Sequence, residues 1–180
     1  MSHPIRSALL LIDMQHGLYH APEAPWQREA LLANVQLLIR RARAAVAPVL
    51  AARHTGPAGS PIAAGSAAWQ LLPELELDPA HDYLFDKTRP DCFIGTGLQG
   101  WLQARHISQL VLAGMKTQYC VDTTCRAANV HGLQCVLAAD AHSCMDTPQL
   151  AASQIIAHHN ATLHGAFAQV VPSSQIVFQA

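Results

Sequence analysis

The segment 114–121 places a cysteine where its chemistry could matter. An apolar run over 109–113 ends at Gly114, and Cys120 follows at the predicted start of an amphipathic helix. Free backbone N–H groups and the positive end of the helix dipole favour thiolate over thiol at such a position, and the thiolate is the nucleophile. The same N–H groups can stabilise an oxyanion. The alternative is a buried cysteine packed under the helix, and this segment alone leaves both interpretations open.

The elements that must position this cysteine alternate along the chain as short apolar runs and helical patterns, which predicts an α/β fold with a parallel sheet. We expect a single domain over residues 1–180, because no repeat, linker or low-complexity tract divides the chain. The predicted strands cover 8–13, 49–53, 82–86, 109–113, 134–139 and 169–171. The predicted helices cover 28–47, 96–104 and 118–131, and a fourth runs from Thr147-Pro148 to about residue 159.

Three reactive side chains fall at the ends of these predicted strands. Asp13 ends the first strand, Lys87 follows the third and Cys120 follows the fourth. In open parallel sheets, ligands bind beyond the carboxyl ends of the strands, so an acid or base, a cation and a nucleophile share one edge. Each has a structural alternative: Asp13 a cap or ion-pair partner, Lys87 a solvated lysine, Cys120 a core residue. Their agreement on one edge favours a catalytic site.

The motifs around these residues resemble those of the isochorismatase-like cysteine hydrolases, which include nicotinamidases, N-carbamoylsarcosine amidases and isochorismatases. The resemblance covers residues 8–159, and its three motifs come in the family's order. They are Leu11-Ile12-Asp13-Met14-Gln15, Asp86-Lys87 followed by Phe93 and Thr96-Gly97-Leu98, and Gly114-Met115-Lys116-Thr117-Gln118-Tyr119-Cys120-Val121. The resemblance implies a three-layer α/β/α Rossmann-like fold with a six-stranded parallel sheet of order 3-2-1-4-5-6.

The resemblance also implies a role for each residue. Asp13 would take the thiol proton, Cys120 would attack a carbonyl carbon to form a thioester, and Lys87 would support the charges. The backbone amides of Lys116 and Cys120 would bind the oxyanion, and the Met115–Lys116 peptide would be cis. Together these roles imply hydrolysis of a small amide or related C–N bond.

Two other functions compete with this one. In isochorismatase-type vinyl-ether hydrolysis, Asp13 would act as an acid and Cys120 would be a bystander. A catalytically silent member would serve as an oligomeric binding protein. The presence of Cys120 favours C–N hydrolysis, because several true isochorismatases lack the cysteine.

The substrate pocket and its metal content are predicted from the neighbouring segments. We expect the pocket to be lined by Gln15, Tyr19, His54, Phe93 and Tyr119. Metal-dependent nicotinamidases carry an Asp-x-His after strand two, but this chain has Arg53-His54-Thr55-Gly56 there, with no carboxylate. We therefore expect neither a metal nor another cofactor.

The composition limits the partners and the compartment. The chain has a net charge of -1, with no basic stripe and no apolar stretch of membrane-spanning length, so neither nucleic acid nor membrane is expected. Charged residues make up only 13%, which predicts a homo-oligomer, dimer or tetramer, acting on a small-molecule substrate. The five cysteines are odd in number and lack disulfide spacing, which predicts a reducing compartment and hence the cytoplasm.

Overall fold

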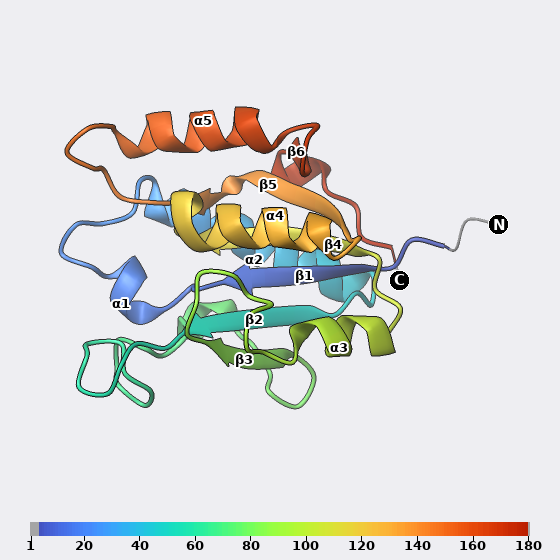
Figure 1. Ribbon diagram of the computed structural model, residues 1–180, viewed down its shortest axis with the longest axis horizontal. Helices are drawn as coiled ribbons and strands as arrows, with labels where there is room; N and C mark the ends of the chain where they lie inside the picture. Colours follow the sequence, from blue (N-terminus) through green and yellow to red (C-terminus); the bar gives the residue numbers. More distant parts are fainter. Residues whose placement is uncertain (1–3, 180) are drawn as a thin grey trace.

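A six-stranded parallel sheet forms the centre of the protein, with strand order β3-β2-β1-β4-β5-β6. The computed structural model describes residues 4–179. The order agrees with the one implied by the family resemblance, and the carboxyl ends of the strands lie together at the left of Figure 1. The strands are β1 (Ser7–Ile12), β2 (Val49–His54), β3 (Tyr83–Lys87), β4 (Gln109–Met115), β5 (Gln134–Ser143) and β6 (Gln169–Val171).

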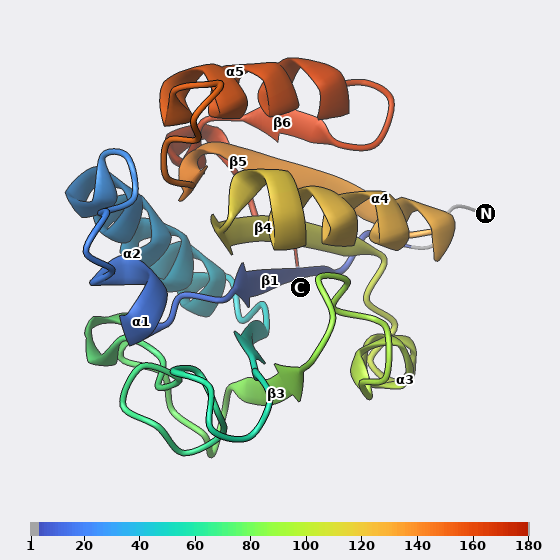
Figure 2. The same cartoon turned by 60° about the vertical axis from the view of Figure 1, so that its left-hand side comes forward.

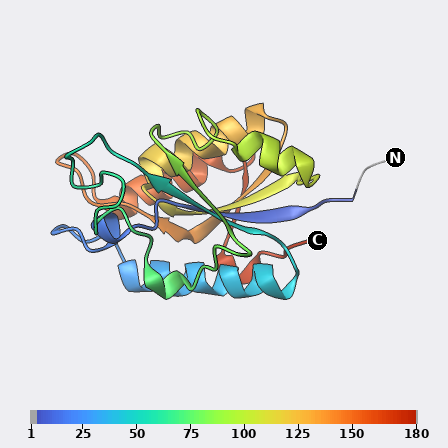
Figure 3. The same cartoon turned by 90° about the horizontal axis from the view of Figure 1, so that it is seen from below.

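Helices cover both faces of this sheet, which confirms the three layers. Figure 3 shows α2 along one face and α3 and α4 along the other. Figure 2 brings the carboxyl edge forward and shows α1 and the segment after β2 gathered there. The helices are α1 (His16–Tyr19), α2 (Arg28–Ala44), α3 (Leu98–Ala104), α4 (Asp122–Val130) and α5 (Ala152–Leu163), with short turns η1 (Pro73–Leu75), η2 (Thr117–Val121) and η3 (Ser173–Gln175).

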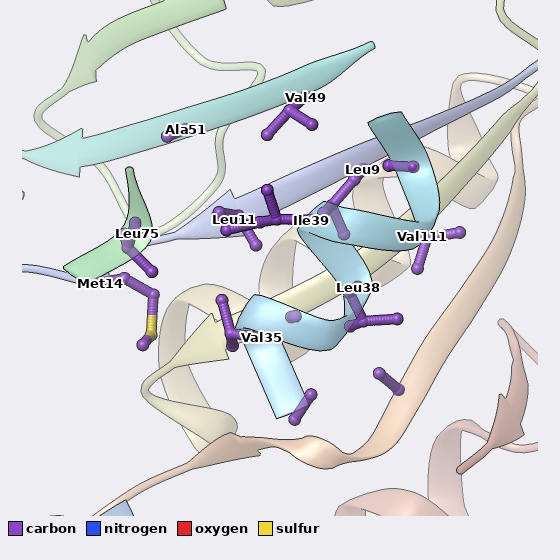
Figure 4. Packing of buried hydrophobic residues seen from close by; sticks show 14 of the residues in the cluster. Leu9, Leu11, Met14, Val35, Leu38, Ile39, Val49, Ala51, Leu75 and Val111 are labelled. Atoms are coloured by element: carbon purple, nitrogen blue, oxygen red, sulfur yellow. The ribbon is translucent and has the colours of Figure 1, made fainter. Parts of the chain in front are cut away.

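The core on the α2 side follows from two sequence patterns. Every residue of β1 is buried, as expected for a central parallel strand covered on both faces. Along α2, apolar residues recur every three or four positions and form one buried face. Figure 4 shows side chains of this face, Val35, Leu38 and Ile39, against Leu9 and Leu11 of β1.

The opposite face of the sheet has its own apolar core, and it contains the candidate nucleophile. Leu98 and Leu102 of α3 pack there, together with Cys125 and Ala128 of α4. Cys120 belongs to this cluster. The thiol therefore lies under the α3–α4 layer, near the carboxyl edge of the sheet.

Strand β4 continues beyond the predicted stop at Gly114, because glycine is needed within the strand itself. Gly114 has φ +126 and pairs with Ile12 of β1. A Cβ at this position would collide with the Ile12 backbone. Glycine thus allows β1 and β4 to approach each other just before the residues that follow them, Asp13 and η2.

Three helix predictions need correction. The helix predicted over 118–131 is a single π-helical turn, η2, followed by α4. The helix predicted from Thr147-Pro148 begins at Ala152, because the Thr147 hydroxyl accepts the Leu150 N–H in a separate turn and Asp146 accepts the Ala152 N–H. The helix predicted over 28–47 ends at Ala44, before a residue with φ +57 at Val46.

Within the described residues, no helix combines the length and the apolar character that a membrane crossing requires.

Candidate active site

Asp13 leaves the sheet at the end of β1 with its side chain buried. Its φ is +51, a left-handed conformation that aspartate tolerates better than most residues. Its N–H still donates to the Ala52 carbonyl of β2 at 3.0 Å, and its own carbonyl accepts the Gln15 N–H at 2.8 Å. The strand therefore turns sharply at this residue, which is only 1% exposed.

Lys87 ends β3, two strands away from β1, and its long side chain reaches back to Asp13. Its Nζ lies 2.8 Å from Asp13 Oδ2, 3.2 Å from Cys120 Sγ and 3.2 Å from the Arg89 carbonyl oxygen. His54 Nδ1 is a fourth acceptor at 3.3 Å. An ammonium has three protons, so these four acceptors compete for them. The structure therefore brings Asp13, Lys87 and Cys120 into contact around one buried cation.

The ion pair keeps charge on two buried groups. Burial raises the pKa of Asp13 above its ordinary value, and the Lys87 ammonium works against that rise. Burial is the largest single influence and would lower the pKa of Lys87, but the Asp13 carboxylate together with Cys92 and Cys120 raises it. Asp13 Oδ1 is buried and has no hydrogen-bond partner among residues 4–179. One carboxylate oxygen is thus held by lysine, and the other is a free acceptor.

Cys120 is a thiol at rest, which corrects the expectation that its position favours the thiolate. Burial raises the pKa of Cys120 to about 12, and the neighbouring Asp13 carboxylate adds to this effect, while Lys87 opposes it. The reason is that Cys120 lies inside η2 with a side chain only 8% exposed, instead of at an open helix terminus. A thiolate here forms only as its proton leaves, with the ammonium 3.2 Å away to stabilise it.

The backbone before Cys120 makes a tight turn. The Lys116 carbonyl accepts the N–H groups of Tyr119, at 3.1 Å, and of Val121, at 3.3 Å. The peptide bond between Met115 and Lys116 is cis. One carbonyl therefore closes the turn and keeps Cys120 close to Lys116, just beyond the end of β4.

Two of the predicted pocket residues meet at the end of β2. His54 Nδ1 faces the Lys87 ammonium and must accept, so its proton lies on Nε2. Burial, helped by the lysine charge, lowers the pKa of His54, which keeps the ring neutral. Gln15 is 1% exposed, and its side-chain amide bonds the His54 backbone at 2.8 and 3.0 Å and the Trp69 carbonyl at 2.8 Å. Gln15 therefore positions His54, and we assign it no contact with substrate.

The structure places Tyr19 and Phe93 on opposite faces of the sheet. Tyr19 is buried in the core on the α2 side of the sheet, the opposite face from Cys120. The Phe93 ring lies 4.5 Å from that of His131, which follows the far end of α4. Phe93 nevertheless belongs to the buried cluster that contains Cys120, so its place in the pocket stays a prediction. Tyr19 supports the core of the other face.

Tyr119 is exposed and lines a cleft whose walls do not include the Cys120 thiol. Its side chain is 55% exposed. A cleft of about 350 Å³ lies here, and its walls include Glu23, Lys116, Gln118, Tyr119, Met145 and Asp146. Residue types alone could not show that segment 21–23 and segment 145–147 would complete this wall.

The donor atoms around the lysine do not suit a metal ion. Atoms of Asp13, His54 and Cys120 lie within 4.8 Å of one another, a spacing that a metal could bridge. The Lys87 ammonium, however, is 2.8 to 3.3 Å from an atom of each of them. A divalent cation would have to displace this buried ammonium, so we assign the three acceptors to the lysine.

Sequence reasoning missed a second buried polar group, which lies on the other side of η2. His142 of β5 is 3% exposed and contacts Thr117 Oγ1 at 2.9 Å and Asn160 Oδ1 at 2.8 Å. Its signal was a histidine three residues after the apolar run over 134–139, because a buried imidazole needs partners for both nitrogens.

The chain is similar to known proteins over most of its length. A model of the isochorismatase domain matches residues 7–171. A streptothricin hydrolase of Streptomyces noursei is 33% identical over 141 residues, which are 78% of this chain and 51% of that protein. The chain thus spans about half the length of that relative.

Two further matches extend over most of both chains. A secreted isochorismatase effector of Verticillium dahliae is 29% identical over 171 residues, covering 94% of this chain and 90% of the effector. A solved isochorismatase family protein has a TM-score of 0.86 and 33% identity, covering 92% of this chain and 97% of that one.

Proposed function

The chain belongs to the isochorismatase family, and on that premise we propose that it hydrolyses a small amide or related C–N bond through a thioester on Cys120. One observation carries this proposal. A single ammonium contacts both the Cys120 sulfur and Asp13, whose second carboxylate oxygen is buried and has no partner among the described residues. That arrangement offers a base for the thiol proton and a cation for the thiolate.

In the first step, the Cys120 proton passes to Asp13 as the sulfur attacks the substrate carbonyl carbon. A C–S bond forms, and the carbonyl oxygen becomes an oxyanion, which the backbone amides of Lys116 and Cys120 would bind. The raised pKa of Asp13 makes it a stronger base than an ordinary carboxylate. Lys87 stays protonated, and its positive charge stabilises the negative charge as this moves from the Asp13 carboxylate to the Cys120 sulfur.

In the second half, the tetrahedral intermediate loses its amine. The C–N bond breaks, Asp13 returns its proton to the departing nitrogen, and a thioester on Cys120 remains. Asp13 then takes a proton from a water molecule, which attacks the thioester carbonyl. The carboxylic acid leaves, and the thiol is restored when Cys120 recovers the proton from Asp13.

The position of Lys87 supports a reaction without metal. Its ammonium already occupies the centre of the acceptors that a metal would use, and it is nearly fully buried. His54, with its proton on Nε2, would offer a hydrogen-bond donor to the substrate.

The experiment is a turnover assay on a panel of amides, ureas and hydroxamates, with isochorismate included. We expect wild type to release amine, ammonia or hydroxylamine from at least one member of the panel. Cys120→Ala should lose this activity by about 10⁴-fold or more, as nucleophile removal does in serine hydrolases. Cys135→Ala is the matched control and should keep activity within about threefold. Cys135 lies at the start of β5, at the end of the sheet opposite the site, so its thiol makes no interaction with the transition state.

The same assay separates the alternatives. Retained turnover in Cys120→Ala would overturn the thioester mechanism. Hydrolysis of isochorismate alone, dependent on Asp13 and not on Cys120, would establish ether hydrolysis instead. Binding of panel members without any turnover by wild type would indicate a silent binding protein.

We also propose a homo-oligomer, dimer or tetramer, on the ground of exposed apolar side chains such as Val46 and Val130, which are 82% and 84% exposed. Light scattering during size-exclusion chromatography tests this, and a single species at 19.4 kDa would contradict it. The cytoplasmic location stays a prediction, since one relative is named a secreted effector.

A further inference from the structure

A directional chain of hydrogen bonds lies behind η2, on the side away from Lys87. Asn160 Nδ2 donates to the Ala139 carbonyl at 3.1 Å, so its Oδ1 is the atom that accepts from His142. His142 must then carry its proton on Nε2, which leaves Nδ1 as an acceptor. The Thr117 hydroxyl, 2.9 Å away, donates to that nitrogen. The chain therefore runs in one direction, from Thr117 through His142 and Asn160 to Ala139.

A bulge in β5 puts His142 in place. Leu112 of β4 pairs with Leu137, but Gly114 pairs with His142, so β5 advances five residues while β4 advances two. Bulges of this kind re-aim side chains and are common beside active sites. Asp140, at the bulge, accepts from the Ser173 N–H at 2.7 Å and its hydroxyl at 3.1 Å, which fixes the bulged segment.

The imidazole in this chain is neutral. His142 is buried, and the charges that act on its pKa are those of His159 of α5 and Asp140 of β5. Burial lowers the pKa of His142 to about 4, so the ring is uncharged near neutral pH. A protonated ring would donate from both nitrogens, and the Thr117 hydroxyl would then have to rotate and accept, which reverses this bond.

We propose that His142 is a positioning residue of the proposed hydrolase, which fixes η2 through Thr117 and thereby sets the place of the Cys120 thiol beside Asp13 and Lys87. Thr117 is the first residue of η2 and Cys120 is the fourth, so the turn joins the two groups directly. Thr117 is only 1% exposed, and its bond to His142 holds the start of the turn against β5. This inference rests on the proposed function, because it assumes that the placed thiol is the nucleophile.

The test measures how fast iodoacetamide alkylates Cys120 between pH 6 and pH 10.5, by mass spectrometry of the Cys120 peptide. Two matched pairs separate positioning from stability. Thr117→Ser keeps the donor hydroxyl and Thr117→Val removes it. His142→Asn keeps an acceptor near the Nδ1 position, whereas His142→Gln keeps a donor near the Nε2 position and loses the acceptor for Thr117.

In wild type, Thr117→Ser and His142→Asn, the alkylation rate should still rise at pH 10, because the thiol is buried beside the carboxylate. In Thr117→Val and His142→Gln, η2 loses its bond to β5 and the thiol becomes more exposed. The midpoint of the alkylation rate against pH should then fall by at least about one pH unit, towards ~8.5, the pKa of an ordinary cysteine thiol. Thermal unfolding of each variant identifies those that fold.

A wild-type alkylation curve in folded Thr117→Val and His142→Gln overturns the proposal. If both variants fail to fold, Asn160→Ala is the deciding variant. It removes the acceptor that fixes the proton of His142 on Nε2, and Asn160 is only half-buried in α5, so the change should be tolerated. A midpoint shift there supports the proposal, and a wild-type curve overturns it. Alkylation needs no substrate, so this result stands apart from Cys120→Ala turnover, whose retention would defeat the proposed function alone.

Discussion

Two buried polar groups flank the turn that carries Cys120, and they differ in how completely their hydrogen bonds are formed. In the charged group, made of Asp13, Lys87 and Cys120, one carboxylate oxygen has no partner among the described residues, and the ammonium meets more acceptors than it has protons. In the neutral group, made of Thr117, His142 and Asn160, each donor that we can orient meets one acceptor.

This difference corresponds to the two tasks of an active site. A group that moves protons needs an acceptor that is free at rest and a charge that can be shared as bonds change. A group that only positions a backbone is most rigid when every bond is made. We therefore infer that the incomplete group does the chemistry and the complete group holds it in place.

The largest expected effect concerns the free acceptor on Asp13. Asp13→Asn keeps the shape of the side chain but cannot take the thiol proton, and we expect turnover to fall by about 10³-fold or more. Asp86→Asn is the matched control, because Asp86 forms an ion pair with Arg53 at the surface. Steady-state assays on the panel substrate should show the control within about threefold of wild type. Equal activity of the two variants would remove Asp13 from the reaction.

Unfolding free energies should show that Asp13 and Lys87 of the charged group act as a buried ion pair. Lys87→Met leaves the Asp13 carboxylate buried without its cation, which should cost about 4 kcal/mol in urea denaturation. The double variant Asp13→Asn with Lys87→Met removes both charges, so it should be less destabilised than the sum of the single variants. Strict additivity would mean that the two groups do not interact as an ion pair.

Gly114 connects the two groups, because it pairs with Ile12 on one side and with His142 on the other. Gly114→Ala adds a Cβ that meets the Ile12 backbone at a φ of +126. We expect a loss of about 3 kcal/mol in unfolding free energy, from the clash and the strained backbone together. Gly132→Ala is the contrast, with a positive φ of +78 but nothing within 4 Å of the added Cβ. Equal losses would show that the approach of β1 and β4 is unimportant.

The pH dependence of stability has opposite signs in the two groups. The pKa of His142 falls from 6.5 to about 4 on folding, so the unfolded chain binds more protons between these values. This group therefore contributes stability above pH 6.5 that is lost as the pH falls towards 4, about 3 kcal/mol in all. Asp13, whose pKa is raised on folding from 3.8, works in the other direction and adds stability as the pH falls.

Urea denaturation at several pH values between 4 and 7 measures that slope. His142→Asn should flatten it, because asparagine does not titrate. His158→Asn, on the exposed side of α5, should leave the slope unchanged. A slope that survives in His142→Asn would assign it to other groups.

The sequence predicted the charged group because its members sit at strand ends. Apolar runs located β1, β3 and β4 to within a few residues, and in a parallel sheet the residues after such runs share an edge. The family resemblance supplied the strand order, which places Asp13 beside β4. Local pattern and order together were sufficient for Asp13, Lys87 and Cys120.

The neutral group was invisible because it depends on tertiary features. His142 reaches Thr117 through a bulge in β5, and the prediction ended that strand at residue 139. The resting thiol was also missed, since the pKa of Cys120 is set by burial and by a carboxylate from a different strand. Gln15 sits in a recognised motif, but only the structure shows that its amide is committed to the backbone of His54 and Trp69.

The proposed reaction requires that the Cys120 sulfur becomes acylated during turnover. The direct measurement is rapid acid quenching of wild type with its panel substrate, followed by mass spectrometry of the intact protein and of the Cys120 peptide. We expect an acyl mass increment on Cys120 that forms and decays at least as fast as turnover. Turnover that continues in Cys120→Ala, with no increment on the wild-type peptide at any quench time, would contradict it.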